Sequence, residues 1–544
     1  MKKRLLSLLL ASAMVMACLT ACGGKEEPAE TTATETTAVA EDDVAEAKIL
    51  RVASEDPQVP LDMHLYTYSI IMKISDNVYE SLLLTNPQGE LEPVLLTQMP
   101  TLSEDKLTYS FELKEGVKFH NGATLTSNDV KYSLERMVAK KAMGSIIGTV
   151  AGYDEFDAGE AEEITGIKVI DDTHFDITLT EVYTPLLAAL STPYAAIYPA
   201  EACEAAGDSW GMTELYGTGP FKMVSYQAGV GVELVKNEEY HGGEVKLDGV
   251  NYTFIDEPIT GINAYKAGDI DVVYMESTLY PTFAEDAEIK DEMYSFSPVG
   301  GYYLGINSKE IPEKEVRQAL NYAMDRKALC EGPLFGTAVP NSNFLQAGLI
   351  GANPDAEQFE YNPEKAKELL AAAGYTEPID DDGCVYEFEL AVNTKYAAGI
   401  NIATALQAQM KEAGIKVNVN QVDSAAWSDM KASGSLTVGL SSWYVDYNDP
   451  DSMLYPVSDG RVDANSIFWH NDEFKSLMEQ GVQTEDAAER QEIYARADEI
   501  LTHEEFGVAM LYNETMFYLK KPYVEGFEVT FTYRTMFKDA DIVK

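Results

Sequence analysis

A carboxylate-rich stretch after the apolar run Val438–Leu440 carries the residues whose types and spacing could do chemistry. The apolar run predicts a short strand, and Trp443 follows it. Asp446 and Asp449 come next, before a proline breaks the pattern. From these residues alone two interpretations stay open. The carboxylates cap the turns of a loop, or they hold a cationic group in a binding site.

Metal and catalytic motifs fail at their defining positions. A calcium loop starting at Asp446 would need glycine at Asp451 and glutamate at Val457. His503 and the glutamate after it lack the second histidine of a zinc-peptidase helix. A hydrolase nucleophile elbow would need glycine where Trp443 stands. The six histidines are scattered, and we therefore predict no catalytic residue, no metal and no cofactor: His64, His120, His174, His241, His470 and His503.

Two further patterns lack the residues for phosphate binding or for disulfides. Gly217-Thr-Gly-Pro-Phe-Lys222 predicts a tight crossing of the chain, because a dinucleotide loop would need glycine at Lys222. Behind the N-terminal leader, Cys203, Cys330 and Cys384 remain as an odd number of widely spaced cysteines. This spacing indicates buried or inert thiols rather than a disulfide framework.

The bulk composition predicts an acidic protein of two or three domains. A chain of 544 residues is too long for one hydrophobic core, and its 46% apolar residues can fill several. The formal net charge of −50 keeps a protein soluble and repels nucleic acid and anionic lipid. We therefore exclude nucleic-acid binding and interpret the acidity as a solvated surface.

The N-terminal segment predicts export and lipid anchoring. Met1–Ala21 combines a basic start with a short apolar run, Leu5–Ala17, that is too short to span a bilayer comfortably. Leu19-Thr-Ala-Cys22 resembles the bacterial lipobox, which implies cleavage before Cys22 and thioether lipidation of that residue. Residues 22–47 are rich in Glu, Thr and Ala and predict a flexible acidic tether.

The folded part contains a stretch in which the local signals agree. Leu107–Leu113 alternates apolar and polar residues and predicts a strand. Glycines at positions 116 and 122 mark turns on either side of a second strand, Val117–Phe119. Thr126 or Ser127 can cap a helix that runs through Met137. By its apolar spacing, Ile70–Leu84 also predicts a helix.

The same stretch resembles the signature of the family 5 extracellular solute-binding proteins, the peptide- and nickel-binding lipoproteins of ABC importers. The shared residues are Gly-Val-Lys-Phe-His at 116–120, a glycine at 122, and an Asp-Val helix that ends with Glu-Arg at 135–136. Val316–Arg326 resembles a second family helix, and Gly217–Lys222 resembles a family crossing segment. The resemblance covers the chain from about Lys48 to the C-terminus.

The resemblance implies an α/β, two-lobe periplasmic-binding-protein-like fold (type II, cluster C) with an extra domain inserted in the first lobe. We expect lobe I to comprise residues 48–75, 216–300 and 507–544, with the inserted domain at 76–215 and lobe II at 301–506. The segment Val508–Tyr512 is thereby expected to return to the first lobe. Ligand would bind in the cleft between the lobes and be enclosed when they close.

The resemblance also assigns candidate site residues. In peptide-binding relatives a matching Trp-x-x-Asp segment lines the cleft. Carried over to this chain, Trp443 borders a side-chain pocket, and Tyr444 and Val445 offer main-chain groups that pair with the ligand like a neighbouring strand. Asp446 would hold the ligand's α-ammonium, since a buried ammonium needs a charged, hydrogen-bonded partner. Trp427 is a further candidate to border the cleft.

The sequence departs from dipeptide-binding relatives where those use an arginine for the ligand's carboxylate. In the corresponding segment, at about 393–395, the nearby cation is Lys395. Between Trp427 and Asp446 the only basic residue is Lys431. Recognition of a free carboxylate therefore stays open, and so do longer peptides and non-peptide ligands.

These expectations combine into a substrate-binding lipoprotein of an ABC importer. We expect a monomer, not an enzyme, that captures an oligopeptide or dipeptide and delivers it to the permease subunits. Lipidated Cys22 would anchor it to the outer face of the bacterial cytoplasmic membrane. An oligosaccharide or a nickel complex is the alternative ligand in the same fold, and a secreted hydrolase is the remote alternative.

Overall fold

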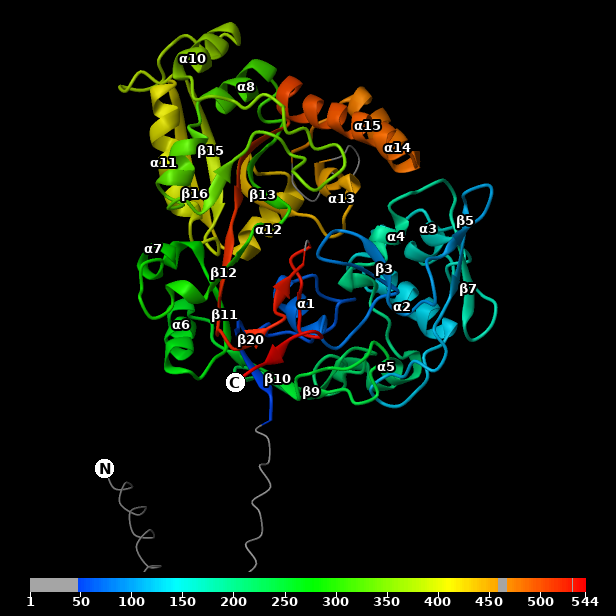
Figure 1. Cartoon of the computed structure of the whole chain (residues 1–544). Coiled ribbons are helices and arrows are strands. Elements are labelled where there is room, and N and C mark those ends of the chain that lie inside the picture. The colour runs from blue at the N-terminus through cyan, green and yellow to red at the C-terminus, as the bar shows by residue number, and fades with distance from the viewer. Residues whose placement is uncertain (1–46, 458–466, 531) are drawn as a thin grey trace, which may run out of the picture. The chain divides into compact units, whose positions relative to one another are not determined.

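The computed structural model describes residues 47–457, 467–530 and 532–544 (Figure 1). The predicted leader at 1–21, the predicted lipidation site Cys22 and the tether, apart from Ala47, lie outside the described residues. Two large β-sheets and a smaller four-stranded sheet, with their helices, organise the described chain. None of the helices within these ranges is long and apolar enough to cross a membrane.

The first large sheet has seven strands in the order β12-β19-β11-β1-β10-β9-β8. Strand β1 pairs in parallel with both β10 and β11, so the carboxyl ends of these three strands meet at the same edge. Helix α6 (Pro258–Ala267) packs against β11. The strands are β1 (Ile49–Ser54), β8 (Phe221–Gln227), β9 (Gly231–Lys236), β10 (Gly249–Phe254), β11 (Val272–Met275), β12 (Met293–Phe296) and β19 (Met516–Lys520).

The second large sheet has six strands in the order β14-β18-β13-β17-β15-β16. Its strands are β13 (Gly300–Ile306), β14 (Ala338–Pro340), β15 (Tyr386–Asn393), β16 (Ile415–Val422), β17 (Val438–Tyr444) and β18 (Val508–Glu514). Helix α11 links the parallel strands β15 and β16 and buries one face against them. The helices of this part are α8 (Lys314–Tyr322), α9 (Arg326–Glu331), α10 (Pro363–Ala372), α11 (Gly399–Glu412), α12 (Ser424–Ser433), α13 (Pro450–Leu454), α14 (Asp472–Gln483) and α15 (Ala487–Glu499).

Two segments connect the large sheets and define where the lobes part. The chain leaves the first sheet after β12 and enters the second at Gly300, close to the predicted boundary at 301. It returns at Thr515, between β18 and β19. The prediction that Val508–Tyr512 joins the first lobe is wrong, because β18 pairs with β13 and β14. All five of these residues are buried, and such an apolar strand suits the interior of either sheet equally well.

The four-stranded sheet, in the order β4-β5-β7-β6, lies within the region predicted as an insertion. Thr126 is the N-cap of helix α2, and it forms a capping box with Asp129, which confirms the predicted helix start. The elements of the described region 69–209 are α1 (Ser69–Ser75), β2 (Leu83–Thr85), β3 (Leu91–Pro93), β4 (Thr101–Leu102), β5 (Thr108–Glu112), α2 (Ser127–Ala139), α3 (Tyr153–Asp157), β6 (Ile167–Val169), β7 (His174–Thr178), α4 (Leu186–Ala189) and α5 (Ala200–Ala206).

Residues 76–215, the predicted insertion, are joined to the first sheet by packing and by buried ion pairs. One hydrophobic core runs through both, from Leu50 of β1 to Phe111 of β5. Arg534, near the C-terminus, donates two hydrogen bonds to the buried carboxylate of Asp76, at 2.8 and 3.0 Å. The remaining short elements are α7 (Tyr280–Phe283), β20 (Val524–Glu525), β21 (Glu528–Val529), β22 (Thr535–Met536) and β23 (Asp541–Ile542).

The predicted crossing at Gly217–Lys222 has a steric cause. A Cβ atom on Gly217 would lie 2.0 Å from the carbonyl oxygen of Val78, and one on Gly219 would lie 2.7 Å from the same atom. Only glycine allows the two backbone segments to pass this closely. The segment around Val78 belongs to the stretch predicted as a helix over Ile70–Leu84, but α1 ends at Ser75 and an irregular, buried segment follows.

Candidate ligand-binding cleft

A cavity of about 1140 Å³ lies between the two large sheets. Its volume is of the order found for small-molecule and peptide sites. One wall comes from the first sheet and α1, and the other from the second sheet and α12. The lining residues named below are Glu55, Asp56, Lys73, Asp256, Tyr274, Glu276, Tyr302, Lys395, Tyr396, Tyr444 and Glu514. Five of these are carboxylates and two are lysines, so the cleft carries an excess of negative charge.

The acidic wall follows from the topology of the first sheet. Glu55 directly follows β1, Asp256 follows β10 by two residues, and Glu276 directly follows β11. These three strands are parallel neighbours. Ligands of open α/β sheets bind outside the carboxyl ends of such strands, because loops from several strands converge there. The fold therefore brings together three carboxylates, of which the first and the last, Glu55 and Glu276, are more than 200 positions apart in the sequence.

The opposite wall is aromatic. Tyr302 of β13 stacks on Tyr396 with ring centroids 4.3 Å apart, and on Tyr512 of β18 at 5.2 Å. The Tyr444 hydroxyl donates a hydrogen bond to Glu514, at the end of β18. Burial raises the pKa of the Glu514 carboxyl to about 7. These rings form a rigid surface on which an apolar or planar part of a ligand can rest.

Two lysines reach the cleft. Lys395, after β15, places its Nζ 4.0 Å from Oε2 of Glu55, so this exposed ion pair spans the two walls. Lys73 of α1 donates to the Tyr533 hydroxyl at 2.6 Å and lies 4.4 Å from the centre of that ring. It also lies 5.2 Å from the ring centre of Tyr274. Cation–π contacts of this kind hold the ammonium in place without neutralising it.

Strand β17 offers an open edge next to the cleft. It pairs with β13 along its whole length, from Val438 to Tyr444. On its other side, within the described ranges, β15 pairs only with Val438 and Gly439. Residues 440–444 therefore have no strand partner on that side within the described ranges, and Tyr444 itself lines the cleft. An extended peptide can add to such an edge as a further strand.

Asp446 lies two residues beyond this edge and is half-buried. Its N–H donates to Oγ of Ser452 at 2.9 Å, and its carboxylate accepts a hydrogen bond from the Tyr194 hydroxyl at 3.3 Å. Tyr194 belongs to the short helical turn Pro193–Ala195 of the insertion. Burial raises the pKa of the Asp446 carboxyl to about 6. Among the described residues, this carboxylate has no cationic partner.

Of the predicted site residues only Tyr444 lines the cavity, whereas Asp446, Trp443, Val445 and Trp427 do not. Trp443 donates its Nε1–H to the Ser452 carbonyl at 2.9 Å and packs against a core of the second sheet. Val445 is buried and donates its N–H to Val299 at 3.0 Å, so a ligand could use only its carbonyl. Trp427 of α12 covers Gly439, where a Cβ atom would meet its ring at 3.0 Å.

Sequence reasoning missed the acidic wall, Lys73 and the tyrosines of β13 and β18. A usable signal was present for Glu55 and Glu276, since each directly follows an apolar strand that could be parallel to its neighbour. The tyrosines carry no such signal because aromatic residues are equally common in a core. Within residues 47–457, 467–530 and 532–544, no group of three or more His, Cys, Asp or Glu side chains is placed to hold a metal ion.

Comparison with protein families decides the relationship. The family model for bacterial extracellular solute-binding proteins, family 5, matches residues 90–465, which is more than half of the chain. The chain belongs to this family. Family 5 consists of substrate-binding proteins rather than enzymes.

The chain is similar to two curated proteins and to a solved structure with different names. The chain is 27% identical over 473 residues to heme-binding protein A of Haemophilus influenzae, covering 83% of this chain and 84% of the relative. It is 25% identical over 471 residues to the periplasmic oligopeptide-binding protein OppA of Salmonella typhimurium, covering 84% and 85%. The solved structure of the ABC transporter-associated periplasmic binding protein DppA from Helicobacter pylori with peptide STSA superposes with a TM-score of 0.78, at 22% identity, over 92% of this chain and 98% of that one. This likeness establishes the two-lobe α/β fold for the family 5 chain described here.

Proposed function

We propose that this protein is the substrate-binding lipoprotein of an ABC importer and that it captures peptides by their amino end. The peptide lies between the two large sheets and adds as a strand to the open edge of β17. Its α-ammonium pairs with Asp446, and the lobes close on it before it passes to the permease. Cys22, lipidated after removal of the leader at 1–21, tethers the monomer to the outer face of the cytoplasmic membrane.

The observation that carries the proposal is the position and state of Asp446. A half-buried carboxylate with no cationic partner in the described part of the chain is costly, unless a ligand supplies the opposite charge. It stands just past five residues of open strand edge. Main-chain pairing along that edge would give affinity without selecting side chains, and the carboxylate would fix the position of the amino end.

The relatives support peptide as the ligand class without deciding it. OppA of Salmonella typhimurium is named for oligopeptides, and the Helicobacter pylori structure contains a peptide. Heme-binding protein A is named for a ligand without an α-ammonium. A heme, oligosaccharide or nickel complex remains the second candidate class, and for it Asp446 would have no ammonium to pair with.

The test compares peptides with and without an amino terminus. The protein is incubated with an equimolar mixture of tri- to octapeptides of mixed sequence, and separately with the same mixture after N-acetylation. Bound and free species are identified by native mass spectrometry. We expect stoichiometric retention of unmodified, intact peptides from the first mixture and little retention from the second. Equal retention of acetylated peptides, or no retention from either mixture, would refute capture by the amino end. Conversion of the peptides to fragments would favour a hydrolase.

A further inference from the structure

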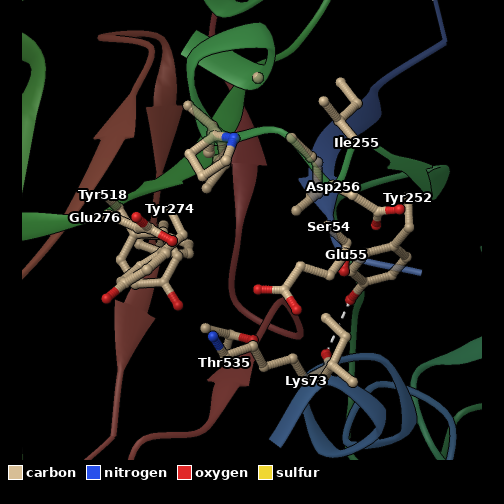
Figure 2. Close-up of a pocket in the computed structure, with 18 of the residues that line it drawn as sticks. Ser54, Glu55, Lys73, Tyr252, Ile255, Asp256, Tyr274, Glu276, Tyr518 and Thr535 are labelled. Atoms are coloured by element: carbon tan, nitrogen blue, oxygen red, sulfur yellow. Dashed lines mark hydrogen bonds between the residues drawn. The ribbon is translucent and has the colours of Figure 1, made fainter. Parts of the chain in front are cut away.

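A second, smaller pocket opens from the acidic wall of the cleft into the first sheet (Figure 2). Its volume is about 90 Å³. Six of its lining residues also line the large cavity, and they therefore form its mouth: Glu55, Ile70, Lys73, Asp256, Tyr274 and Glu276. The pocket is thus a side chamber of the cleft rather than a separate site.

The interior of this side chamber is mostly apolar, with Ser54 and Thr535 among its polar residues. Val52, Val272 and Val273 line it from the sheet, and Phe527 and Phe537 line it from the C-terminal segment. Two small residues also stand on its wall. These are Ala53 of β1 and Gly261 of α6, and a Cβ atom on Gly261 would already lie 3.1 Å from the Val273 side chain.

The volume selects the size of the group that fits. A water molecule occupies about 30 Å³ of liquid, and an engineered cavity that holds benzene has about 150 Å³. A chamber of about 90 Å³ therefore has room for three or four carbon atoms. That matches the side chains of valine, leucine and isoleucine, and it is too small for an aromatic ring.

The charged residues at the mouth determine which ligand side chains can enter the chamber. Three carboxylates surround the mouth, against the ammonium of Lys73 and that of Lys395, which pairs with Glu55, so the remaining negative charge would repel an acidic side chain. Tyr518, on the wall of the chamber, is only 4% exposed, and its hydroxyl interacts with Lys73 and Tyr533.

We propose that this chamber is a side-chain subsite of the cleft, which takes one aliphatic side chain of valine to leucine size and rejects acidic and aromatic side chains. The inference rests on the proposed function, since it takes the ligand to be a peptide. It adds a selectivity that main-chain pairing along β17 does not provide.

The test uses pentaalanine and its single-substitution series, in which each position in turn carries leucine, glutamate or phenylalanine. Affinities are measured by isothermal titration calorimetry. For the unaltered protein we expect one position at which leucine binds at least about tenfold more tightly than alanine, because added methylene groups leave water. At that same position glutamate and phenylalanine should bind no better than alanine.

Two variants and a control connect this preference to the chamber. Ala53→Leu fills the chamber and should abolish the leucine preference while pentaalanine still binds. Ile70→Ala widens the mouth and should improve binding of the phenylalanine peptide at that position. Ala267→Leu, at an exposed position of α6 that lines neither cavity, should change nothing. Melting curves confirm that each variant is folded.

The outcomes separate the subsite from the function. If pentaalanine binds but no position prefers leucine, or if Ala53→Leu keeps the preference, the subsite is overturned while peptide capture stands. If no peptide of the series and none of the mixed peptides binds, the proposed function falls and the subsite falls with it.

Discussion

Replacing Asp446 by asparagine tests the proposed amino-end recognition directly. The change removes the negative charge and keeps the shape, and an amide oxygen can still accept the hydrogen bond from the Tyr194 hydroxyl, which lies 3.3 Å from the carboxylate. The fold is therefore expected to survive, and the effect should be confined to ligand binding. The variant then presents a neutral amide to the incoming ammonium.

The size of the loss follows from the burial of the pair. Truncating one partner of a buried, hydrogen-bonded charge pair in an interface costs about 2–5 kcal/mol, much of it because the other charge is left buried and unpaired. At about 1.4 kcal/mol for each factor of ten, this is a loss of affinity of roughly 30- to 5000-fold. A fully exposed carboxylate would lose far less, on the order of fivefold.

The assay is a double-mutant cycle. Affinities of one retained peptide and its N-acetylated form are measured by calorimetry for the unaltered protein and for Asp446→Asn. Acetylation should cost the unaltered protein about as much as the substitution does, and it should cost the variant little more, because the pair is already broken. Asp429→Asn, an exposed position on the neighbouring helix α12, is the control for the loss of one charge. If both proteins distinguish the acetylated peptide equally well, Asp446 does not hold the amino end.

The pKa of Asp446 adds a pH dependence with a definite sign. In the ligand-free protein burial raises the pKa of this carboxyl to about 6, while a peptide α-ammonium, with a pKa near 8, stays charged below that pH. Affinity should therefore fall as the pH drops below about 6, since the carboxyl must lose its proton to bind. The contribution of Asp446 to folding stability depends on pH in the opposite direction. It is present at low pH and is lost as the pH rises through about 6. Both dependences should disappear in Asp446→Asn.

Three further predictions concern other parts of the molecule. Cys22→Ser should move the protein from the membrane to the soluble fraction of fractionated cells, and continued membrane retention would rule out the lipid anchor. Arg136→Met should lower the free energy of unfolding by about 3–5 kcal/mol in denaturant titrations, because it leaves the buried carboxylate of Asp62 without its partner. Asp62 accepts hydrogen bonds from Arg136 at 2.6 and 2.9 Å. An unchanged unfolding midpoint would contradict this prediction. Lys395→Met should change peptide affinity less than about fivefold, since its ion pair with Glu55 is exposed. A hundredfold loss in calorimetry would instead identify Lys395 as a direct ligand contact.

Local signals in the sequence determined the features that depend on near neighbours alone. The helix start at Thr126 was predictable because its side chain and that of Asp129 pair within one turn. The crossing at Gly217 was predictable because two glycines and a proline in six residues permit little else. The start of β17 was predictable from the apolar run Val438–Leu440, although the strand continues through Trp443 to Tyr444. The family motif then identified the overall fold.

Features that depend on distant partners were decided only in the tertiary structure. Val508–Tyr512 forms a strand, as its composition suggests. Whether this strand pairs with β13 or with a strand of the first sheet depends on which strand of the folded lobes has an unpaired edge. The helix predicted over Ile70–Leu84 stops at Ser75, and the next residue, Asp76, pairs with Arg534, more than 450 positions along the chain.

The candidate site also combines features that the sequence predicts with features that only the tertiary structure decides. The motif picked out Asp446, but its half-buried carboxylate accepts a hydrogen bond from Tyr194, more than 250 positions earlier in the chain, a contact that no local pattern encodes. Glu55, Asp256 and Glu276 form one acidic wall only because β1, β10 and β11 become parallel neighbours. A sequence specifies which side chains are available, and strand order, which long-range packing selects, determines which of them meet.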